Sequence, residues 1–154
     1  MSNIRPFSTA DTTALVILFE EMQRHYRVPC PPSSVIESNL AELPAGVEMM
    51  VAETDGIIGF VAFSAIYPGP GLQSGLFMKE LFVSATSRGN GVGKALIQAV
   101  ARVAIERGHK RVDWTADRKD SGLLGFYSSL GALAQDEKVF YRLTGDALTS
   151  LAAP

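Results

Sequence analysis

The stretch from Leu76 to Gly93 constrains the fold most, because an apolar strand-like run leads into a glycine-rich turn and then into a long amphipathic segment. The turn reads Arg88-Gly89-Asn90-Gly91-Val92-Gly93. Alternating glycines leave backbone N–H groups uncovered by side chains, and these groups point the same way as the positive end of the helix dipole. We therefore expect a strand–turn–helix unit whose turn binds a pyrophosphate, such as that of a nucleotide-type cofactor.

Two common phosphate-binding motifs do not fit this turn. A Walker A loop needs glycine at the position of Arg88 and a hydroxyl at the position of Ala95. A dinucleotide fingerprint needs a third glycine where Lys94 stands. The remaining pattern, Arg-Gly-x-Gly-x-Gly, resembles the acetyl-CoA turn of the GCN5-related N-acetyltransferases; a tight turn without a ligand is the alternative interpretation.

Other segments extend the resemblance to most of the chain. The run Met78–Val83 enters the turn as a strand, and Asp120–Ala132, with its Phe126-Tyr127 pair, is similar to a conserved segment of that family. The tail from Lys138 to Leu148 resembles the diamine-acetyltransferase-like branch. The resemblance implies an α/β (α+β) fold with a mixed, mostly antiparallel sheet of six to seven strands and helices on both faces.

Composition describes an ordinary globular protein. At 154 residues the chain is long enough for one domain, which we expect to span residues 1–154. A net charge of −2 without a basic block argues against nucleic acid or an anionic membrane surface as a partner. No apolar run reaches membrane-spanning length, and Cys30, the only cysteine, has no partner for a disulfide or a metal site. We expect a cytoplasmic protein without a metal.

The pattern along the chain predicts the individual elements. Strands are expected at Ile4–Phe7, Val47–Glu53 and Ile57–Ile66. Asp11 is a candidate N-cap for a first helix, and the pair Ser34 and Glu37 is a candidate capping box for a second.

The tail Val139–Leu143 reads as a strongly apolar strand at a sheet edge. Because an unpaired apolar edge is normally covered or paired, we expect a homodimer.

The resemblance implies acetyl-CoA as co-substrate. Backbone N–H groups of the turn would hold its pyrophosphate, and the strand Leu81-Phe82-Val83 would pair with the pantetheine arm and help to polarise the thioester carbonyl. Asp120 replaces the asparagine often found at its position, which puts the usual amide contact to pantetheine in doubt. The implied cofactor-binding residues are Leu81, Phe82, Val83, Arg88, Gly89, Asn90, Gly91, Val92, Gly93, Lys94, Asp120 and Phe126.

Tyr127 is the candidate acid, because related acetyltransferases place at this position a tyrosine that protonates the coenzyme A thiolate. A phenol is a weaker acid than a thiol, so full proton transfer would cost roughly 2 kcal/mol, which a hydrogen bond can offset. The alternative is that its ring simply packs beside Phe126 and Leu130.

A general base is needed because a primary amine is mostly protonated at neutral pH, and freeing it costs about 4–5 kcal/mol. The diamine-acetylating branch has a Glu-Asp pair where this chain has Lys79-Glu80. Glu80 is the candidate base, acting through water. Neighbouring residues of a strand face opposite sides, so Glu80 can replace an acid at position 79 only through a bulge or register change. Lys79 either binds an anionic acceptor or is a solvated strand residue.

His25 and Tyr26 end the first helix, which borders the acceptor site in this family, and are candidate substrate-binding residues; a surface histidine is the alternative for His25. Glu20 and Glu21 of the same helix are expected to be solvated.

The sequence thus indicates an N-acetyltransferase that moves an acetyl group from acetyl-CoA to the primary amine of a small molecule by direct attack in a ternary complex. A non-catalytic acyl-CoA-binding module and a protein or peptide N-acetyltransferase are the alternatives. Diamines, aminoglycosides, amino acids and other small amines remain candidate acceptors.

Overall fold

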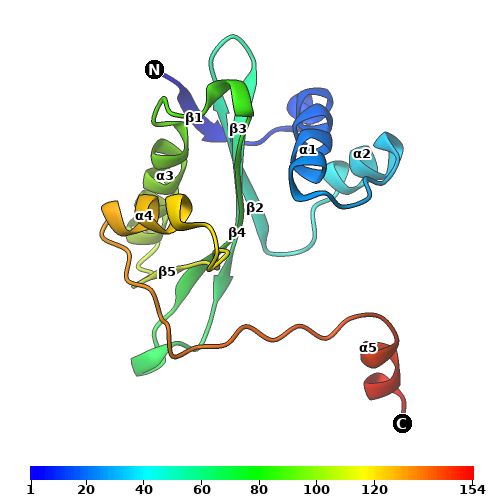
Figure 1. Ribbon diagram of the computed structural model, residues 1–154, viewed down its shortest axis with the longest axis vertical. Helices are drawn as coiled ribbons and strands as arrows, with labels where there is room; N and C mark the ends of the chain where they lie inside the picture. Colours follow the sequence, from blue (N-terminus) through cyan, green and yellow to red (C-terminus); the bar gives the residue numbers. More distant parts are fainter. The chain divides into compact units, whose positions relative to one another are not determined.

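The computed structural model describes residues 1–154, and the chain divides into two compact units, residues 1–115 and 116–154. The first unit contains a sheet of five strands in the order β1-β2-β3-β4-β5 (Figure 1). The strands are β1 (Asn3–Pro6), β2 (Val47–Glu53), β3 (Ile57–Ile66), β4 (Gly75–Val83) and β5 (Val112–Asp113). The helices of this unit are α1 (Thr12–Tyr26), α2 (Ser33–Ala41) and α3 (Val92–Glu106).

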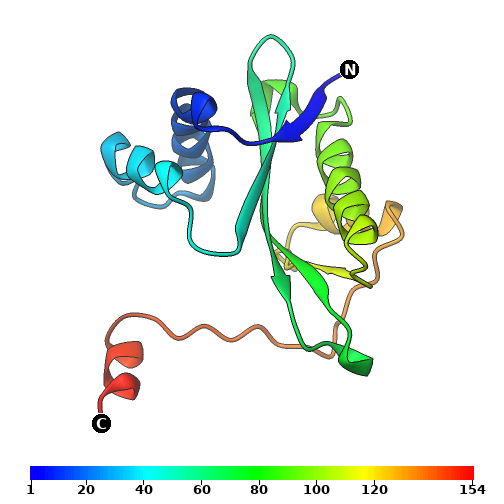
Figure 2. The same cartoon turned by 180° about the vertical axis from the view of Figure 1, so that it is seen from behind.

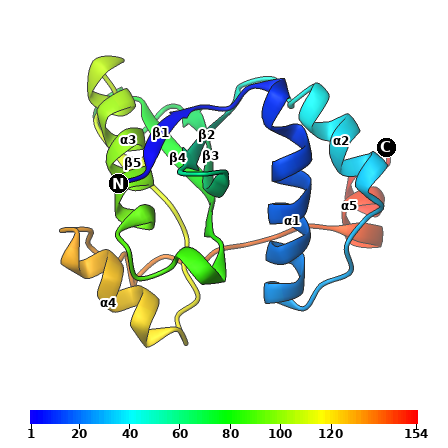
Figure 3. The ribbon, with the colours of Figure 1, turned by 90° about the horizontal axis from the view of Figure 1, so that it is seen from above.

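The sheet is mixed and mostly antiparallel. Strands β1 to β4 pair antiparallel in chain order, and only β5 runs parallel to its neighbour β4. Helices α1 and α2 lie on one side of the sheet and α3 on the other, as the views from behind and from above show (Figures 2 and 3). The predicted fold class is therefore confirmed, but the sheet has five strands instead of six to seven.

Each face of the sheet carries its own hydrophobic core. The α1-side core joins α1 and α2 to the sheet through residues such as Leu15, Leu40 and Phe60. The α3-side core packs α3 on the opposite face through residues such as Leu76 and Leu96. Fully burying one such side chain stabilises a fold by about 1.5–3 kcal/mol, so the two layers together hold the sheet between its helices.

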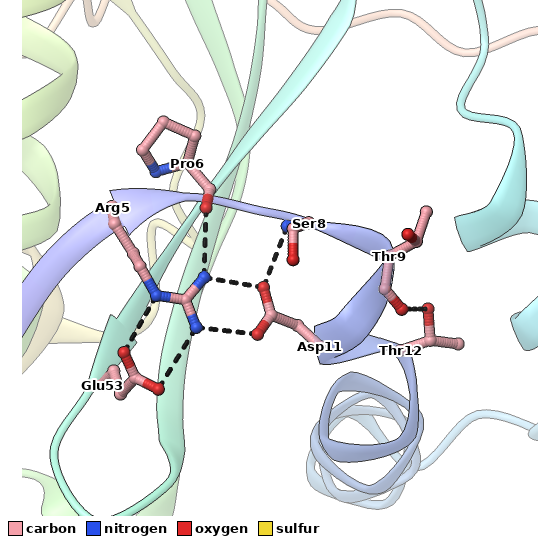
Figure 4. A network of polar contacts seen from close by, with 7 residues as sticks. All are labelled: Arg5, Pro6, Ser8, Thr9, Asp11, Thr12 and Glu53. Carbon is pink, nitrogen blue, oxygen red and sulfur yellow. Dashed lines mark hydrogen bonds and ion pairs between the residues drawn. The ribbon is translucent and has the colours of Figure 1, made fainter.

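An ion network fixes the start of α1 to the edge of the sheet (Figure 4). The guanidinium of Arg5 donates from Nη1 and Nη2 to the carboxylate of Asp11 at 2.8 and 2.7 Å, and from Nε to Glu53 at 2.9 Å. Asp11 also accepts from the backbone N–H of Ser8 at 2.9 Å. Asp11 occupies the N-cap position of α1, as predicted, but its side chain serves this network instead of the helix N-terminus.

The second helix differs from its prediction at the start. Helix α2 begins at Ser33 with Pro32 as its N-cap, so Ser34 lies inside the first turn and forms no capping box with Glu37. The proline restricts the backbone before the helix, and no side chain caps the first turn.

The unit 116–154 contains two helices, α4 (Ser121–Ser129) and α5 (Gly145–Ala152), and no strand. The prediction of a strand at Val139–Leu143 is wrong. A strand is held by a ladder of hydrogen bonds to a neighbour, and this segment has none; its side chains are exposed, 72% for Val139, 60% for Phe140 and 88% for Tyr141. The expectation of a single domain over residues 1–154 stays a prediction.

Candidate active site

A β-bulge in β4 lies at the centre of the candidate site. Met78 and Glu80 pair with consecutive residues of β3, so Lys79 is an extra residue without an opposite partner. The side chains change faces at this point: Met78 packs in the α3-side core and Phe82 in the α1-side core, although a regular strand would place both on one face. A bulge or register change was the condition under which Glu80 could replace an acid at position 79, and the structure has a bulge here.

Glu80 lies two residues before Phe82 and therefore shares its face, on the side of α1. The carboxylate is half-buried and forms a hydrogen bond with the hydroxyl of Tyr26, which lies at the end of α1. Burial raises the pKa of Glu80, whereas the charge of Lys79 and the bond from Tyr26 partly offset this rise. A carboxylate with a raised pKa is a stronger base, as proton removal from an ammonium requires.

The ring of His25, at the end of α1, lies close to two other aromatic rings. It lies 5.9 Å from the ring of Phe82 and 5.2 Å from that of Tyr26. Burial, followed by the charge of Glu80, raises the pKa of Tyr26, and the positive charge of Arg88 acts in the opposite direction. The structure therefore brings together the predicted residues Glu80, Tyr26 and His25, with Lys79 next to them on the bulge.

A clamp that sequence reasoning missed joins α1 to the segment that follows β4. The carboxylate of Glu21 accepts hydrogen bonds from the hydroxyl of Ser84, at 3.0 and 3.2 Å, and from the backbone N–H of Ala85 at 2.8 Å. Glu21 is therefore a structural acceptor instead of a solvated residue. Its partners are 63 and 64 residues away in the chain, and nothing local in the sequence signals such a contact.

The outer edge of β4 is open over its second half. Strand β5 pairs with β4 only at Leu76 and Phe77, so β4 has no strand on this side from Met78 to Val83. Such an edge presents unpaired N–H and C=O groups that can pair with an extended ligand.

The register decides which peptide groups face this open edge. The N–H of Ser84 donates to β3, at the carbonyl of Ile58. Because successive residues of an antiparallel strand alternate between the two edges, the amide of Phe82 also points to β3 and those of Leu81 and Val83 point outward. Of the three predicted pantetheine-pairing residues, Leu81 and Val83 are thus placed to pair, and the carbonyl of Val83 already accepts from Nε of Arg88 at 2.9 Å.

The glycine turn leads from this strand to α3. Gly89 and Gly91 have φ angles of +79° and +77°, in the left-handed region that favours glycine, and a Cβ at either position would meet nothing within 4 Å. Gly91 is the N-cap of α3 and offers no side chain to its first turn. Lys94 is exposed in that turn, and Asn90 donates to the carbonyl of Ser87 at 3.5 Å. The turn therefore presents uncapped N–H groups at a helix N-terminus, a suitable arrangement for a pyrophosphate.

The remaining predicted residues lie in the unit 116–154. The carboxylate of Asp120 accepts from the backbone N–H of Leu123 at 2.9 Å and so caps α4. Phe126 and Tyr127 are half-buried on α4, with ring centroids 5.4 Å apart. The roles proposed for these residues from the sequence stay predictions.

Two further observations concern the chain as a whole. No group of three or more His, Cys, Asp or Glu side chains is arranged to hold a metal ion, and Cys30 is exposed with a free thiol. None of the helices combines the length and the apolar character that crossing a membrane requires.

Comparison with known proteins decides the family. A model of the acetyltransferase (GNAT) family matches residues 15–132. The chain belongs to this family. The match contains β4, the glycine turn and α4, so this GNAT protein carries its open strand edge and its turn in the part of the chain that defines the family.

Relatives of this GNAT protein include named N-acetyltransferases. It is 35% identical over 95 residues to the L-ornithine N5-acetyltransferase NATA1 of Arabidopsis thaliana. The aligned segment covers 62% of this chain and 42% of that protein. It is 26% identical over 118 residues to N-acetyltransferase family 8 member 2 of Rattus norvegicus, covering 76% of this chain and 52% of the relative. The chain thus spans about half the length of these two curated relatives.

Solved structures show the same fold. An integron cassette protein, VCH_CASS6, from the mobile metagenome of V. cholerae is 31% identical, with a TM-score of 0.90 over 99% of this chain and 98% of that one. An aminoglycoside acetyltransferase, meta-AAC0020, from an uncultured soil metagenomic sample is 21% identical, with a TM-score of 0.77 over 94% and 97% of the two chains. The second likeness concerns the fold alone.

Proposed function

We propose that this protein transfers the acetyl group of acetyl-CoA to the primary amine of a small molecule, by direct attack of the amine in a ternary complex. The observation that carries the proposal is the arrangement of β4. The open edge of this strand leads into the glycine turn, and its bulge presents the half-buried Glu80 toward α1. A cofactor-binding edge and a candidate base thus belong to one strand.

The residues fit acetyl-CoA as co-substrate. The uncapped N–H groups at Gly91 and the first turn of α3 would hold the pyrophosphate, and the outward peptide groups of Leu81 and Val83 would pair with the pantetheine arm. Acetyl-CoA supplies a thioester, so that a C–N bond to the acceptor forms as the C–S bond breaks. A hydrogen-bond donor at the open edge can stabilise the negative charge that develops on the carbonyl oxygen.

Three proton transfers complete the reaction. Glu80 accepts a proton from the acceptor ammonium, directly or through water, and its raised pKa supports this role. Tyr127 donates a proton to the departing sulfur, which leaves coenzyme A as a thiol. The second proton that the nitrogen loses as the amide forms returns through water to the Tyr127 oxygen. The products are the N-acetylated amine and coenzyme A, with no covalent intermediate on the protein. The names of the relatives, an ornithine N5-acetyltransferase among them, support an amine acceptor.

A coenzyme A release assay with acetyl-CoA tests the proposal across amino acids, diamines, aminoglycosides and short peptides. Amine-dependent release that falls at least tenfold in Tyr127→Phe supports the enzyme and its acid. Unchanged release in this variant would discard Tyr127 as the acid. Tight coenzyme A binding without release from any acceptor favours a non-catalytic binding module, and peptides outperforming free amines favour a peptide N-acetyltransferase.

We also propose that the protein is a cytoplasmic homodimer. The C-terminal part of the chain exposes several large apolar side chains, which a partner chain could cover. These residues are Leu133, Val139, Phe140, Tyr141, Leu143, Leu148 and Leu151. Light scattering should give twice the mass of one chain, and Phe140→Ser with Tyr141→Ser should lower it. A monomeric wild type at working concentration would contradict the dimer.

A further inference from the structure

The side chain of Arg88 folds back from the glycine turn along β4. Its Nε donates to the carbonyl of Val83 at 2.9 Å, and its Cζ lies 5.3 Å from the centroid of the Phe82 ring. That ring belongs to the α1-side core. The guanidinium therefore lies at the end of α1, and its two terminal nitrogens are left to bind something else, since the residue as a whole is exposed.

The same ring links Arg88 to the candidate base. Phe82 also contacts His25, and the neighbouring Tyr26 forms a hydrogen bond with Glu80 and experiences the positive charge of Arg88. Lys79, exposed on the bulge, acts on Glu80 with its own positive charge. One cation, from the bulge, thus acts on the carboxylate itself, and a second, from the turn, acts on its neighbour Tyr26.

Glu21, a carboxylate of the same helix as Tyr26, keeps its charge, but its oxygens already accept hydrogen bonds from Ser84 and Ala85 and are not free for a second ammonium. A diamine would place its second ammonium close to two positive side chains and gain little. An amine that also bears a carboxylate would place one group on the base and the other on a guanidinium, the side chain best suited to bind a carboxylate through two parallel hydrogen bonds.

We propose that the acceptor is an amino acid and that Arg88 binds its carboxylate while Glu80 faces its reacting amine. The inference deepens the proposed acetyl transfer and rests on it. It gives the two parts of Arg88 separate roles: the backbone belongs to the cofactor turn, and the side chain to the acceptor side of β4.

Matched acceptors isolate the carboxylate. L-Ornithine and 1,4-diaminobutane differ only in this group, as do L-lysine and 1,5-diaminopentane. For each pair, kcat/KM at saturating acetyl-CoA gives a selectivity ratio of amino acid over diamine. A hydrogen-bonded charged pair predicts a ratio of about 10 to 100 in the wild type. Arg88→Gln should bring the ratio close to one, through a loss confined to the amino acids.

Controls separate binding of the acceptor from folding and from the cofactor. Arg88→Lys retains the charge without the planar fork and should give an intermediate ratio. Arg102→Gln removes an exposed cation from the outer face of α3 and should change nothing. The Kd of coenzyme A, from calorimetry, should be nearly the same in Arg88→Gln and the wild type, and thermal melting reports whether each variant is folded.

Each outcome has a defined meaning. A wild-type ratio at or below one, or an unchanged ratio in Arg88→Gln, overturns the amino acid assignment but leaves acetyl transfer standing. A weaker Kd for coenzyme A with an unchanged ratio would assign the guanidinium to a cofactor phosphate instead. If the protein binds coenzyme A and acetylates other amines but none of these four acceptors, the inference alone is overturned. If it acetylates no amine at all, the proposed function is overturned as well.

Discussion

Replacing Gly91 by alanine separates the binding role of the turn from its role in the fold. Gly91 has a φ angle of +77°, and a Cβ built there would meet nothing within 4 Å. The substitution therefore creates no clash and acts through backbone strain alone. Because the turn is exposed, it can relax away from positive φ when no ligand is bound, and binding must then restore the strained conformation.

The size of the effect follows from this strain. An L-residue in the left-handed region costs about 1–2 kcal/mol. If binding restores this conformation, coenzyme A should bind about 5- to 30-fold more weakly to Gly91→Ala than to the wild type. The melting temperature should change little, since the cost is borne on binding.

Gly108 provides a matched control at the opposite end of the same helix. It has a φ angle of +76° and equally open space around its Cα, but it lies outside the candidate site. Isothermal calorimetry with coenzyme A should therefore show weaker binding for Gly91→Ala and unchanged binding for Gly108→Ala. Equal Kd values for the wild type and both variants would refute the assignment of the turn to the pyrophosphate.

Four further predictions concern the base, the core and the ion network. Glu80→Gln should lower kcat/KM by about 10²- to 10⁴-fold, the range for loss of a general base, in the coenzyme A release assay; less than a threefold loss would exclude it as the base. Tyr26→Phe removes a hydrogen bond that lowers the pKa of Glu80, so the acid limb of the kcat/KM–pH profile should move to higher pH, and a move to lower pH would contradict the contact. Leu96→Ala, at a fully buried position, should cost about 3–5 kcal/mol of unfolding free energy in urea titrations, and a cost below about 1 kcal/mol would mean that α3 packs loosely. The hydrogen bonds from Arg5 lower the pKa of Asp11 in the folded state, so this group stabilises the fold above its unfolded pKa of about 4, and the stabilisation is lost as the pH falls through the folded pKa. Asp11→Asn should flatten that part of the pH dependence of urea unfolding, and an unchanged slope would contradict the network.

Local sequence patterns predicted the strands and turns whose conformation depends mainly on residues close by in the chain. The strand-like runs Val47–Glu53 and Ile57–Ile66 located β2 and β3 at the residues where the structure has them. The glycines at 89 and 91 indicated a turn between a strand and a helix, and both residues lie in such a turn with positive φ. These features depend on backbone sterics and side-chain periodicity, which neighbouring residues in the chain determine.

Features that depend on distant partners were not predictable in the same way. The strand expected at Val139–Leu143 has the right composition, but a strand exists only where another strand pairs with it, and composition does not supply that partner. The clamp of Glu21 on Ser84 and the bulge at Lys79 likewise depend on contacts between α1, β3 and β4. Sequence reasoning stated what a bulge would permit for Glu80, and only the register of β3 against β4 located it.

The most direct test of the account is mass spectrometry of the acceptor together with coenzyme A release, in one reaction of acetyl-CoA with L-ornithine. We predict an N-acetylated amino acid formed in equal amount with free coenzyme A, at a rate that Glu80→Gln strongly reduces. Coenzyme A release without an acetylated amine, or product formation that Glu80→Gln leaves unchanged, would contradict an amine acetyltransferase that uses this carboxylate as its base.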